Sequence, residues 1–406
     1  MTHRPTEPHL LAGADSASPP RRLRRHQLSP ARRSGVLASV GAIVVAAMLA
    51  ACSSSGGSDA PGGSGASASD ASVNTAAAQQ AIAPLVGKPS AFPVDQPLGK
   101  KLPSGQTIAF LQCGTTVCGL FAQLLTPAVK AIGAQFSAIN SGTTAASSQA
   151  AVSSVLALKP AAVLVAGSDP AQFGGGLKQL SDAGIKVVSI SVSKDTAPFG
   201  ITANYIGATT AKTGGSLMAD WAITKKGSTN VVFYGVPAID YSDTMQAAFK
   251  DEMAKNCPSC QVRTVPIDIT TLGTTSPQTI VTDLQSHPDS AVAVFASSEM
   301  ARGLPAALDA AGVKVTTVGY APTPVNLQDI KDGKLTAGLA VDFPLSAWTA
   351  VDVAARLILG EPLTTGEQAG EVPRQILEQK DITFDPSRSW TGYPDFPQRF
   401  AKLWGN

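Results

Sequence analysis

The chain has 406 residues, of which 44% are hydrophobic and only 15% charged, so it is long and apolar enough for two ordinary domains with their own cores. The formal net charge of +2 is unevenly divided, because residues 1–51 hold seven arginines and two acidic residues and the remainder is mildly acidic at −3. The remainder has no basic patch of the kind that binds nucleic acid, so we expect no nucleic-acid partner.

The N-terminus has the pattern of a bacterial export signal. A basic stretch over 21–35 precedes an uncharged stretch over 36–51, which is shorter than the roughly 20 residues that a membrane-spanning helix needs. The tetrapeptide "LAAC" at 49–52 resembles a lipobox, in which the cysteine is lipidated and becomes the new N-terminus. We therefore expect a lipid on Cys52.

This signal predicts where the protein works. Residues 1–51 are expected to be a lipoprotein signal peptide, and 52–104 a lipid-anchored Ser/Gly tether and Pro-rich arm. The protein would then lie on the extracytoplasmic face of the cell membrane. An uncleaved anchor helix is the alternative, and Arg32-Arg33 leaves a twin-arginine signal open.

Four cysteines remain once Cys52 carries a lipid. Exported thiols tend to pair, and four cysteines allow three pairings. The two tight spacings favour local disulfides, Cys113 with Cys118 and Cys257 with Cys260.

The sequence argues against two other uses of these cysteines, zinc binding and redox chemistry. Zinc at the first pair would need two further ligands, and His287 is the one histidine outside the signal, so we expect no metal. The second pair, "CPSC" at 257–260, has the C-x-x-C spacing of a redox motif. It follows a predicted helix rather than opening one, which favours a structural role.

From residue 107 onward, short apolar, β-rich runs alternate with longer helical patterns. Strands are predicted at 107–112, 135–139, 162–166, 186–190, 230–235, 261–267, 291–295 and 315–319. Helices are predicted near 120–134, 144–157, 171–183, 208–225, 241–255, 276–286, 300–311 and 324–332, with a short one at 74–86. The alternation predicts an α/β fold with parallel sheets, whose ligand sites lie at the carboxyl ends of the strands. The stretch 196–206 breaks the rhythm and predicts a crossing between two lobes.

Several phrases in this pattern, from residue 158 onward, point to one family. They are "LKPAAVLVAGSDP" (158–170), "LSDAGIKVVSIS" (180–191), "ANYIGATTAKTGGSLMADW" (203–221), "SHPDSAVAVFASSEMARGLPAALDAAG" (286–312), "TTVGYA" (316–321) and "IKDGKLTAGLA" (330–340). In order and spacing they resemble the type I periplasmic binding proteins of ABC transporters, the ribose-binding-like group related to LacI-type repressor cores. The resemblance covers roughly 105–378, and a lipobox stands where a repressor would have its DNA-binding header.

The resemblance implies two Rossmann-like lobes with parallel sheets, joined by a three-stranded hinge near 204, 341 and 378. The N-terminal lobe would comprise 105–204 plus 342–378, and the C-terminal lobe 205–341 plus 379–406. The implied function is that of an extracytoplasmic solute-binding lipoprotein of an ABC importer. Its partners would be a small-molecule ligand held between the lobes and the permease subunits, and it would need neither catalysis nor a cofactor.

The sequence is compatible with two other functions. The same fold serves as the ligand-sensing partner of a chemoreceptor or histidine kinase. An exported thiol oxidoreductase using Cys257 and Cys260 is the second alternative.

The polar residues with which sugar-binding members grip their ligand are largely replaced. Ala166, Ser191-Val192, Asp243, Ser297, Ser298, Ala321 and either Val341 or Asp342 stand at those positions. Aromatic residues, by contrast, are retained or added. The predicted ligand-binding residues are Thr115, Thr116, Phe121, Ser191, Tyr241, Asp243, Ser297, Ser298, Asp342 and Phe343. This wall predicts a ligand less polar than a simple sugar, either neutral or cationic, with Asp243 or Asp342 as the counter-charge.

Overall fold

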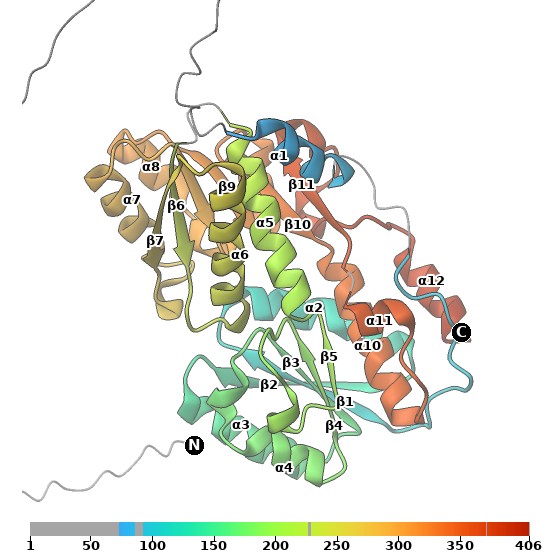
Figure 1. Ribbon diagram of the computed structural model, residues 1–406. Helices are drawn as coiled ribbons and strands as arrows, with labels where there is room; N and C mark the ends of the chain where they lie inside the picture. The colour runs from blue at the N-terminus through green and yellow to red at the C-terminus, as the bar shows by residue number, and fades with distance from the viewer. Residues whose placement is uncertain (1–72, 86–91, 226–228, 371, 406) are drawn as a thin grey trace, which may run out of the picture. The chain divides into compact units, whose positions relative to one another are not determined.

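The computed structural model describes residues 73–85, 92–225, 229–370 and 372–405 (Figure 1). The expected signal peptide, Cys52 and most of the tether lie outside these residues. In the part of the chain that is described, no helix is long and apolar enough to cross a membrane.

The first sheet consists of five parallel strands in the order β2-β1-β3-β4-β5. They are β1 (Thr107–Cys113), β2 (Gln135–Gly142), β3 (Ala162–Ala166), β4 (Lys186–Ile190) and β5 (Ala203–Tyr205). One face is covered by α2 (Thr116–Ala131) and α10 (Phe343–Leu359), the other by α3 (Ala145–Leu158) and α4 (Gly176–Asp182). In β1, Ile108 and Phe110 join one core while Ala109 and Leu111 join the other, as expected for a strand buried on both faces. We call this sheet and its four helices the first lobe.

The second sheet has six strands in the order β11-β10-β9-β8-β6-β7, all parallel except β11, which is antiparallel to β10. The strands are β6 (Asn230–Gly235), β7 (Gln261–Pro266), β8 (Val292–Phe295), β9 (Thr316–Tyr320), β10 (Ala337–Val341) and β11 (Arg374–Glu378). One face is covered by α5 (Ala208–Ile223) and α6 (Asp240–Asn256), the other by α7 (Ser276–Ser286), α8 (Leu304–Ala311) and α9 (Pro324–Lys331). The α5 backbone lies so close to the Met245 carbonyl that a Cβ on Gly215 would overlap it. We call this assembly the second lobe.

The structure confirms the predicted α/β fold of two mainly parallel sheets. All eight predicted strands form, and helices form at all eight places predicted between them. The helix predicted over 171–183 is divided into a 3-10 turn, Pro170–Phe173, and α4, because Gly174 takes a φ of +57° between them. The elements that were not predicted are β5, β10, β11, α10, α11 (Thr365–Ala369) and α12 (Phe396–Leu403).

The predicted lobe boundaries need correction at two places near the C-terminus. Residues 374–378 were assigned to the N-terminal lobe, but they form β11, which pairs with β10 in the second sheet. Residues 379–406 are predicted in the C-terminal lobe; residues 379–388 do pack on α9 there, but α12 packs on α10 of the first lobe through Trp348, Phe396 and Trp404. Both corrections arise because apolar faces on these late segments find partners that sequence order alone does not reveal.

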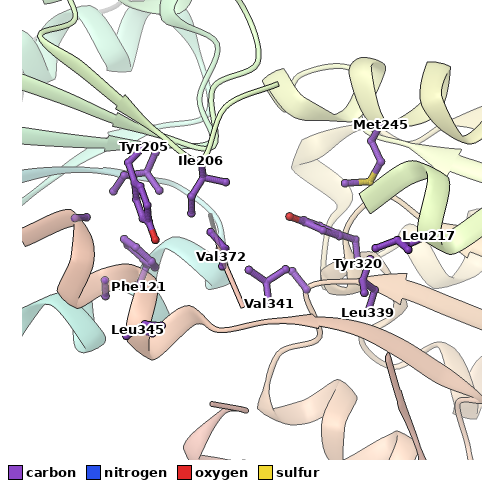
Figure 2. Packing of buried hydrophobic residues seen from close by; sticks show 14 of the residues in the cluster. Phe121, Tyr205, Ile206, Leu217, Met245, Tyr320, Leu339, Val341, Leu345 and Val372 are labelled. Atoms are coloured by element: carbon purple, nitrogen blue, oxygen red, sulfur yellow. The ribbon is translucent and has the colours of Figure 1, made fainter. Parts of the chain in front are cut away.

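The chain passes between the lobes at three apolar positions. Ile206 follows β5, Val341 ends β10 and Val372 precedes β11, and all three are buried. In Figure 2 they lie between two groups of side chains, with Phe121 and Leu345 on one side and residues such as Leu217 and Leu339 on the other. The hydrophobic core therefore continues from one lobe into the other through the hinge.

The N-terminal arm packs on both lobes. Helix α1 (Thr75–Ile82) rests on α5, and the Asn74 N–H donates to the Asn256 carbonyl at 2.7 Å. Further along, the Leu98 N–H donates to the Leu403 carbonyl at 2.9 Å, and the Phe92 ring lies 5.5 Å from that of Phe400. The described part of the arm is thus integrated into the folded body.

A buried charge cluster joins α10, α11 and the C-terminus. Arg356, only 2% exposed, donates from Nε to Asp352 Oδ2 at 2.7 Å, and the same nitrogen lies 3.3 Å from Glu367 Oε2. The Trp404 indole donates to the other Asp352 oxygen at 2.5 Å. Because two carboxylates share one guanidinium, burial and the neighbouring Asp352 raise the pKa of Glu367 to about 8.

Candidate ligand-binding site

A cavity of about 100 Å³, partly open to solvent, lies at the carboxyl ends of strands from both sheets. In the first lobe it is lined at the ends of β1, β2, β3 and β4 by Cys113, Gly142, Ala166 and Ile190. In the second lobe it is lined after β6 and β7 and at the ends of β9 and β10 by Ala238, Ile239, Ile269, Tyr320 and Val341. This is the location that the strand–helix alternation predicts for a ligand site.

Two aromatic pairs form much of the wall. Phe121 on α2 and Phe343 on α10 meet edge to face, with ring centroids 6.4 Å apart and planes at 76°. Tyr241 on α6 and Tyr320 on β9 pack at 5.7 Å. Desolvation raises the pKa of both tyrosines, so their hydroxyl groups stay protonated and neutral. The cavity therefore offers flat apolar faces and neutral hydroxyls.

The rest of the lining is apolar or neutral. No charged side chain lines the cavity among the described residues. Besides the two tyrosine hydroxyls, the polar side chains are those of Thr115, Thr143, Ser168, Gln172, Ser191 and Ser346. A ligand here meets few hydrogen-bonding groups, each of which can fix an orientation but none of which supplies a full charge.

The structure brings together five of the ten predicted ligand-binding residues. Thr115, Phe121, Ser191, Tyr241 and Phe343 all line the cavity. Ser191 does so from a left-handed backbone conformation, with φ at +62°, and its N–H donates to the Tyr205 carbonyl at 3.1 Å. The other five residues lie elsewhere.

The two aspartates expected to act as counter-charges are outside the lining. Asp243 is exposed on α6. Asp342 is fully buried as the N-cap of α10: one carboxylate oxygen accepts the Leu345 N–H, and the other accepts the Gly392 N–H and the Thr391 hydroxyl, each at 2.9 Å. Its carboxylate thus fastens the hinge to the C-terminal segment.

The remaining three predicted residues serve local structure or contacts between the lobes. Ser297 and Ser298 are buried around the 3-10 turn Ser298–Ala301, where the Ser297 hydroxyl accepts the Glu299 N–H at 3.4 Å. Thr116 donates its N–H to Glu299 of the second lobe at 2.8 Å. None of them lines the cavity.

Four positions at which this sequence departs from the sugar-binding pattern do line the cavity. They are Ala166, Ser191, Ala321 and Val341. Three of the four carry no polar side-chain atom, and the fourth carries a single hydroxyl. The cavity wall is therefore largely apolar at these four positions.

Sequence reasoning missed several lining residues that a fuller rule would have found. Ser168 and Gln172 follow β3 by two and six residues, whereas the prediction considered only Ala166, at the strand end. Ser346 lies three residues after Phe343, one helical turn along the same face of α10. Counting the whole loop after each strand and the first turn of each helix would have included all three.

Both predicted local disulfides are present. Cys113–Cys118 joins the end of β1 to the first turn of α2, and both cysteines line the cavity. Cys257–Cys260 closes the turn directly after α6, with Cys257 only 1% exposed. Within the described ranges, no three His, Cys, Asp or Glu side chains gather as metal ligands would.

Comparisons with solved structures recover the same architecture. A 5-methylthioribose transporter solute-binding protein from Thermotoga lettingae, in complex with 5-methylthioribose, is 15% identical, covers 76% of this chain and 99% of its own, and has a TM-score of 0.61. An ABC transporter solute-binding protein from Agrobacterium vitis with bound allitol is 19% identical, covers 68% and 96%, and scores 0.59. A putative LacI transcriptional regulator from Bacteroides fragilis is 16% identical, covers 69% of this chain and 99% of its own, and has a TM-score of 0.58. At these identities the likeness is one of fold.

Sequence comparison adds the family. No curated protein sequence matches the chain. The periplasmic binding protein domain matches residues 119–362, which include most of both sheets and the cavity between their strand ends. Together with the two-lobed architecture, this match shows that the chain belongs to the periplasmic binding protein domain family.

Proposed function

We propose that this chain is the extracytoplasmic solute-binding lipoprotein of an ABC importer, anchored through Cys52 and delivering its ligand to permease subunits. The family and the fold support a binding role, and the lipobox-like "LAAC" at 49–52 supports the anchor. The cavity between the strand ends of the two lobes has the position and the largely apolar lining of a small-molecule site.

The ligand is a neutral small molecule, less polar than a simple sugar. The observation that carries this is the wall itself, with four aromatic rings, alanine and valine at the former polar positions, and no charged side chain in the described lining. A free sugar would meet no charged partner for its hydroxyls in the described lining, and each buried hydroxyl left without a partner would cost about 1–3 kcal/mol. A cationic ligand loses support because Asp243 and Asp342 lie outside the lining.

A thermal-shift screen tests the ligand class. We expect the melting temperature to rise with less polar neutral compounds and to stay unchanged with ribose, xylose and glucose; a strong shift with these sugars alone would overturn the proposal. Ala166→Asp, which places a charge in the cavity wall, should abolish the shift, whereas Ala306→Asp on exposed α8 should preserve it. Mass spectrometry of molecules released by mild denaturation would identify the natural ligand.

Uptake by cells tests the importer role. Cells lacking this chain should fail to accumulate the labelled ligand, and the wild-type gene should restore uptake. Cys52→Ala should not restore it, because the protein would leave the membrane. Normal uptake in the deletion strain would instead favour a sensing role.

A further inference from the structure

Two acidic side chains of the second lobe reach across to backbone amides of the first lobe. One is Glu299, which lies in the 3-10 turn Ser298–Ala301 and is 3% exposed. Its Oε1 accepts the Thr116 N–H at 2.8 Å and also the Thr116 hydroxyl. Thr116 is the first residue of the 16-residue helix α2, so the carboxylate lies at the positive end of a helix.

The other carboxylate belongs to Asp240, the first residue of α6, which is 6% exposed. Its Oδ2 accepts the N–H groups of Ser193 and Lys194, which follow β4 in the first lobe, the latter at 3.3 Å. The Lys194 ammonium lies 3.9 Å from Asp240 Oδ1 and 2.5 Å from Asp169 Oδ2. In return, the Asp240 N–H donates to the Gly167 carbonyl at 3.3 Å. We call the Glu299 and Asp240 contacts the two clasps.

Each clasp adjoins the cavity. Thr116 stands between the lining residues Thr115 and Val117, and Asp240 stands between the lining residues Ile239 and Tyr241. The clasps use different elements in both lobes, so they hold the cavity rim at two separate places. An isolated β-bridge between Ser168 and Ile239 adds to the second.

The hydrogen bonds of the two clasps stabilise contact between the lobes without making it permanent. Hydrogen bonds to a carboxylate are roughly twice as strong as neutral ones. Closing, however, removes both carboxylates from water, and Asp240 Oδ1 and Glu299 Oε2 accept no hydrogen bond in the described structure. The cost of dehydrating the two carboxylates therefore offsets part of the free energy that their hydrogen bonds contribute. The clasps shift the equilibrium between the open and closed arrangements of the lobes toward the closed one, but they do not lock it.

We propose that Asp240 and Glu299 are positioning residues that hold the two lobes together over the cavity, so that the closed form is populated before any ligand binds. The proposal rests on the proposed function only in taking the cavity as the ligand site. A ligand that meets an already closed population loses less affinity to the conformational change.

Amide hydrogen exchange of the full chain, refolded from denaturant to remove bound molecules and measured without ligand, tests this proposal. The reporters are the amides of Thr116, Ser193 and Lys194, whose acceptors belong to the opposite lobe. In the wild-type chain we expect them to exchange more slowly than unprotected amides. Exchange at the unprotected rate would show an open protein and overturn the proposal.

Single variants distinguish opening of the whole interface between the lobes from loss of protection at one clasp alone. Glu299→Ala should speed exchange about tenfold or more at Thr116 and also at Ser193 and Lys194, in the other clasp, because opening is shared. Asp240→Ala should show the reverse cross-effect. An effect confined to the amides of the altered clasp would overturn the proposal.

Two controls complete the test. Asp309→Ala, exposed on α8, should leave all three amides unchanged. Core amides such as those of Val188 and Phe233 should stay protected in every variant, which excludes global unfolding. If one alanine variant does not fold, the wild-type rates and the other variant still decide. Because the exchange experiment uses no ligand, its failure would not affect the result of the thermal-shift screen. Likewise, failure of the thermal-shift screen would not affect the exchange experiment.

Discussion

Phe121 and Phe343 meet edge to face on the cavity wall, although they come from helices near opposite ends of the family-matching region. Helices α2 and α10 pack together on one face of the first sheet, and this packing brings the two rings together. The wall is therefore assembled from segments far apart in the sequence.

Removing one ring should weaken ligand binding. Phe121→Leu keeps an apolar side chain but loses the aromatic face, which is worth about 0.5–1.5 kcal/mol beyond burial, so we expect the Kd to rise at least two- to twelvefold. Isothermal titration with a compound from the thermal-shift screen would measure this. Phe384→Leu changes a ring that packs on the core of the second lobe, outside the cavity lining, and should leave the Kd unchanged. Equal effects of both variants would contradict the prediction.

An asparagine at Ala321 should separate stability from binding. Ala321 has a φ of +55°, a conformation that asparagine adopts more readily than alanine, so Ala321→Asn should keep or raise the free energy of unfolding. The amide would enter the apolar wall and lower the affinity for a less polar ligand. Ala166→Asn should lower affinity without any gain in stability. Urea denaturation and titration read out the two quantities, and tighter binding by either variant would argue against the apolar-ligand assignment.

The two disulfides should differ in what their loss does. Cys113 and Cys118 line the cavity, so replacing both by serine should weaken ligand binding more than it lowers the Tm. Replacing Cys257 and Cys260 by serine, outside the lining, should lower the Tm and spare binding. Differential scanning calorimetry and titration on both double variants would check this. The opposite pattern would make the first bridge merely structural.

Stability should depend on pH through two buried carboxyl groups. Burial raises the pKa of Asp342 from 3.8 to about 7, and burial with the neighbouring Asp352 raises that of Glu367 from 4.5 to about 8. Between about pH 4 and 8 the folded protein therefore holds protons that the unfolded chain has released, so these groups make the free energy of unfolding fall as pH rises.

Urea denaturation at pH 5 and pH 8 measures this dependence. Glu367→Gln should reduce the difference between the two pH values, because the amide does not titrate. Asp243→Asn, at an exposed site, should not change it. An unaltered difference in the Glu367 variant would show that this group does not bind the proton.

The charge cluster around Arg356 should be sensitive to loss of its cation. Arg356→Met leaves the carboxylate of Asp352 buried without a counter-charge, at a cost of about 3–5 kcal/mol in unfolding free energy. Lys178→Met breaks an i,i+4 pair in which both side chains are at least 60% exposed, and should cost less than about 1 kcal/mol. Denaturant titration of both variants checks the contrast, and a similar small loss in each would refute it.

Much of the fold could be predicted because its strands carry a local signal. Runs such as 162–166 and 230–235 are apolar on both faces and are followed by helices, which is the pattern of a buried parallel strand. Three strands were not predicted because their sequence signal is weaker. Strand β5 has only three residues, β10 contains Gly338, where a Cβ would overlap Pro322, and three of the five residues of β11 are polar. Pairing with a neighbouring strand, rather than propensity, makes these segments strands.

The site was predictable only in part. Ser191, directly after β4, could be located because the strand fixes its position. At the end of β10 the sequence left Val341 and Asp342 open, and the predicted ligand-binding residue was Asp342, whereas Val341 lines the cavity. Asp342, one residue beyond β10, caps α10 within the hinge instead of facing the cavity. Its two carboxylate oxygens accept the N–H groups of Leu345 and Gly392. A one-residue difference in the path of a loop decides whether a side chain meets ligand or backbone, and sequence patterns do not resolve it.

The packing of α10 on the first sheet also has a consequence for folding as the chain emerges, N-terminus first, from the ribosome or across the membrane. The strands of the first lobe end at Tyr205, yet α10 and the α12 that packs on it are made only after the strands of the second lobe from β6 to β10. The first sheet must wait, with one face partly bare, while most of the second lobe emerges. The lobe whose strands are made first is therefore the last to be complete, and its exposed face in that interval is where a chaperone would be needed.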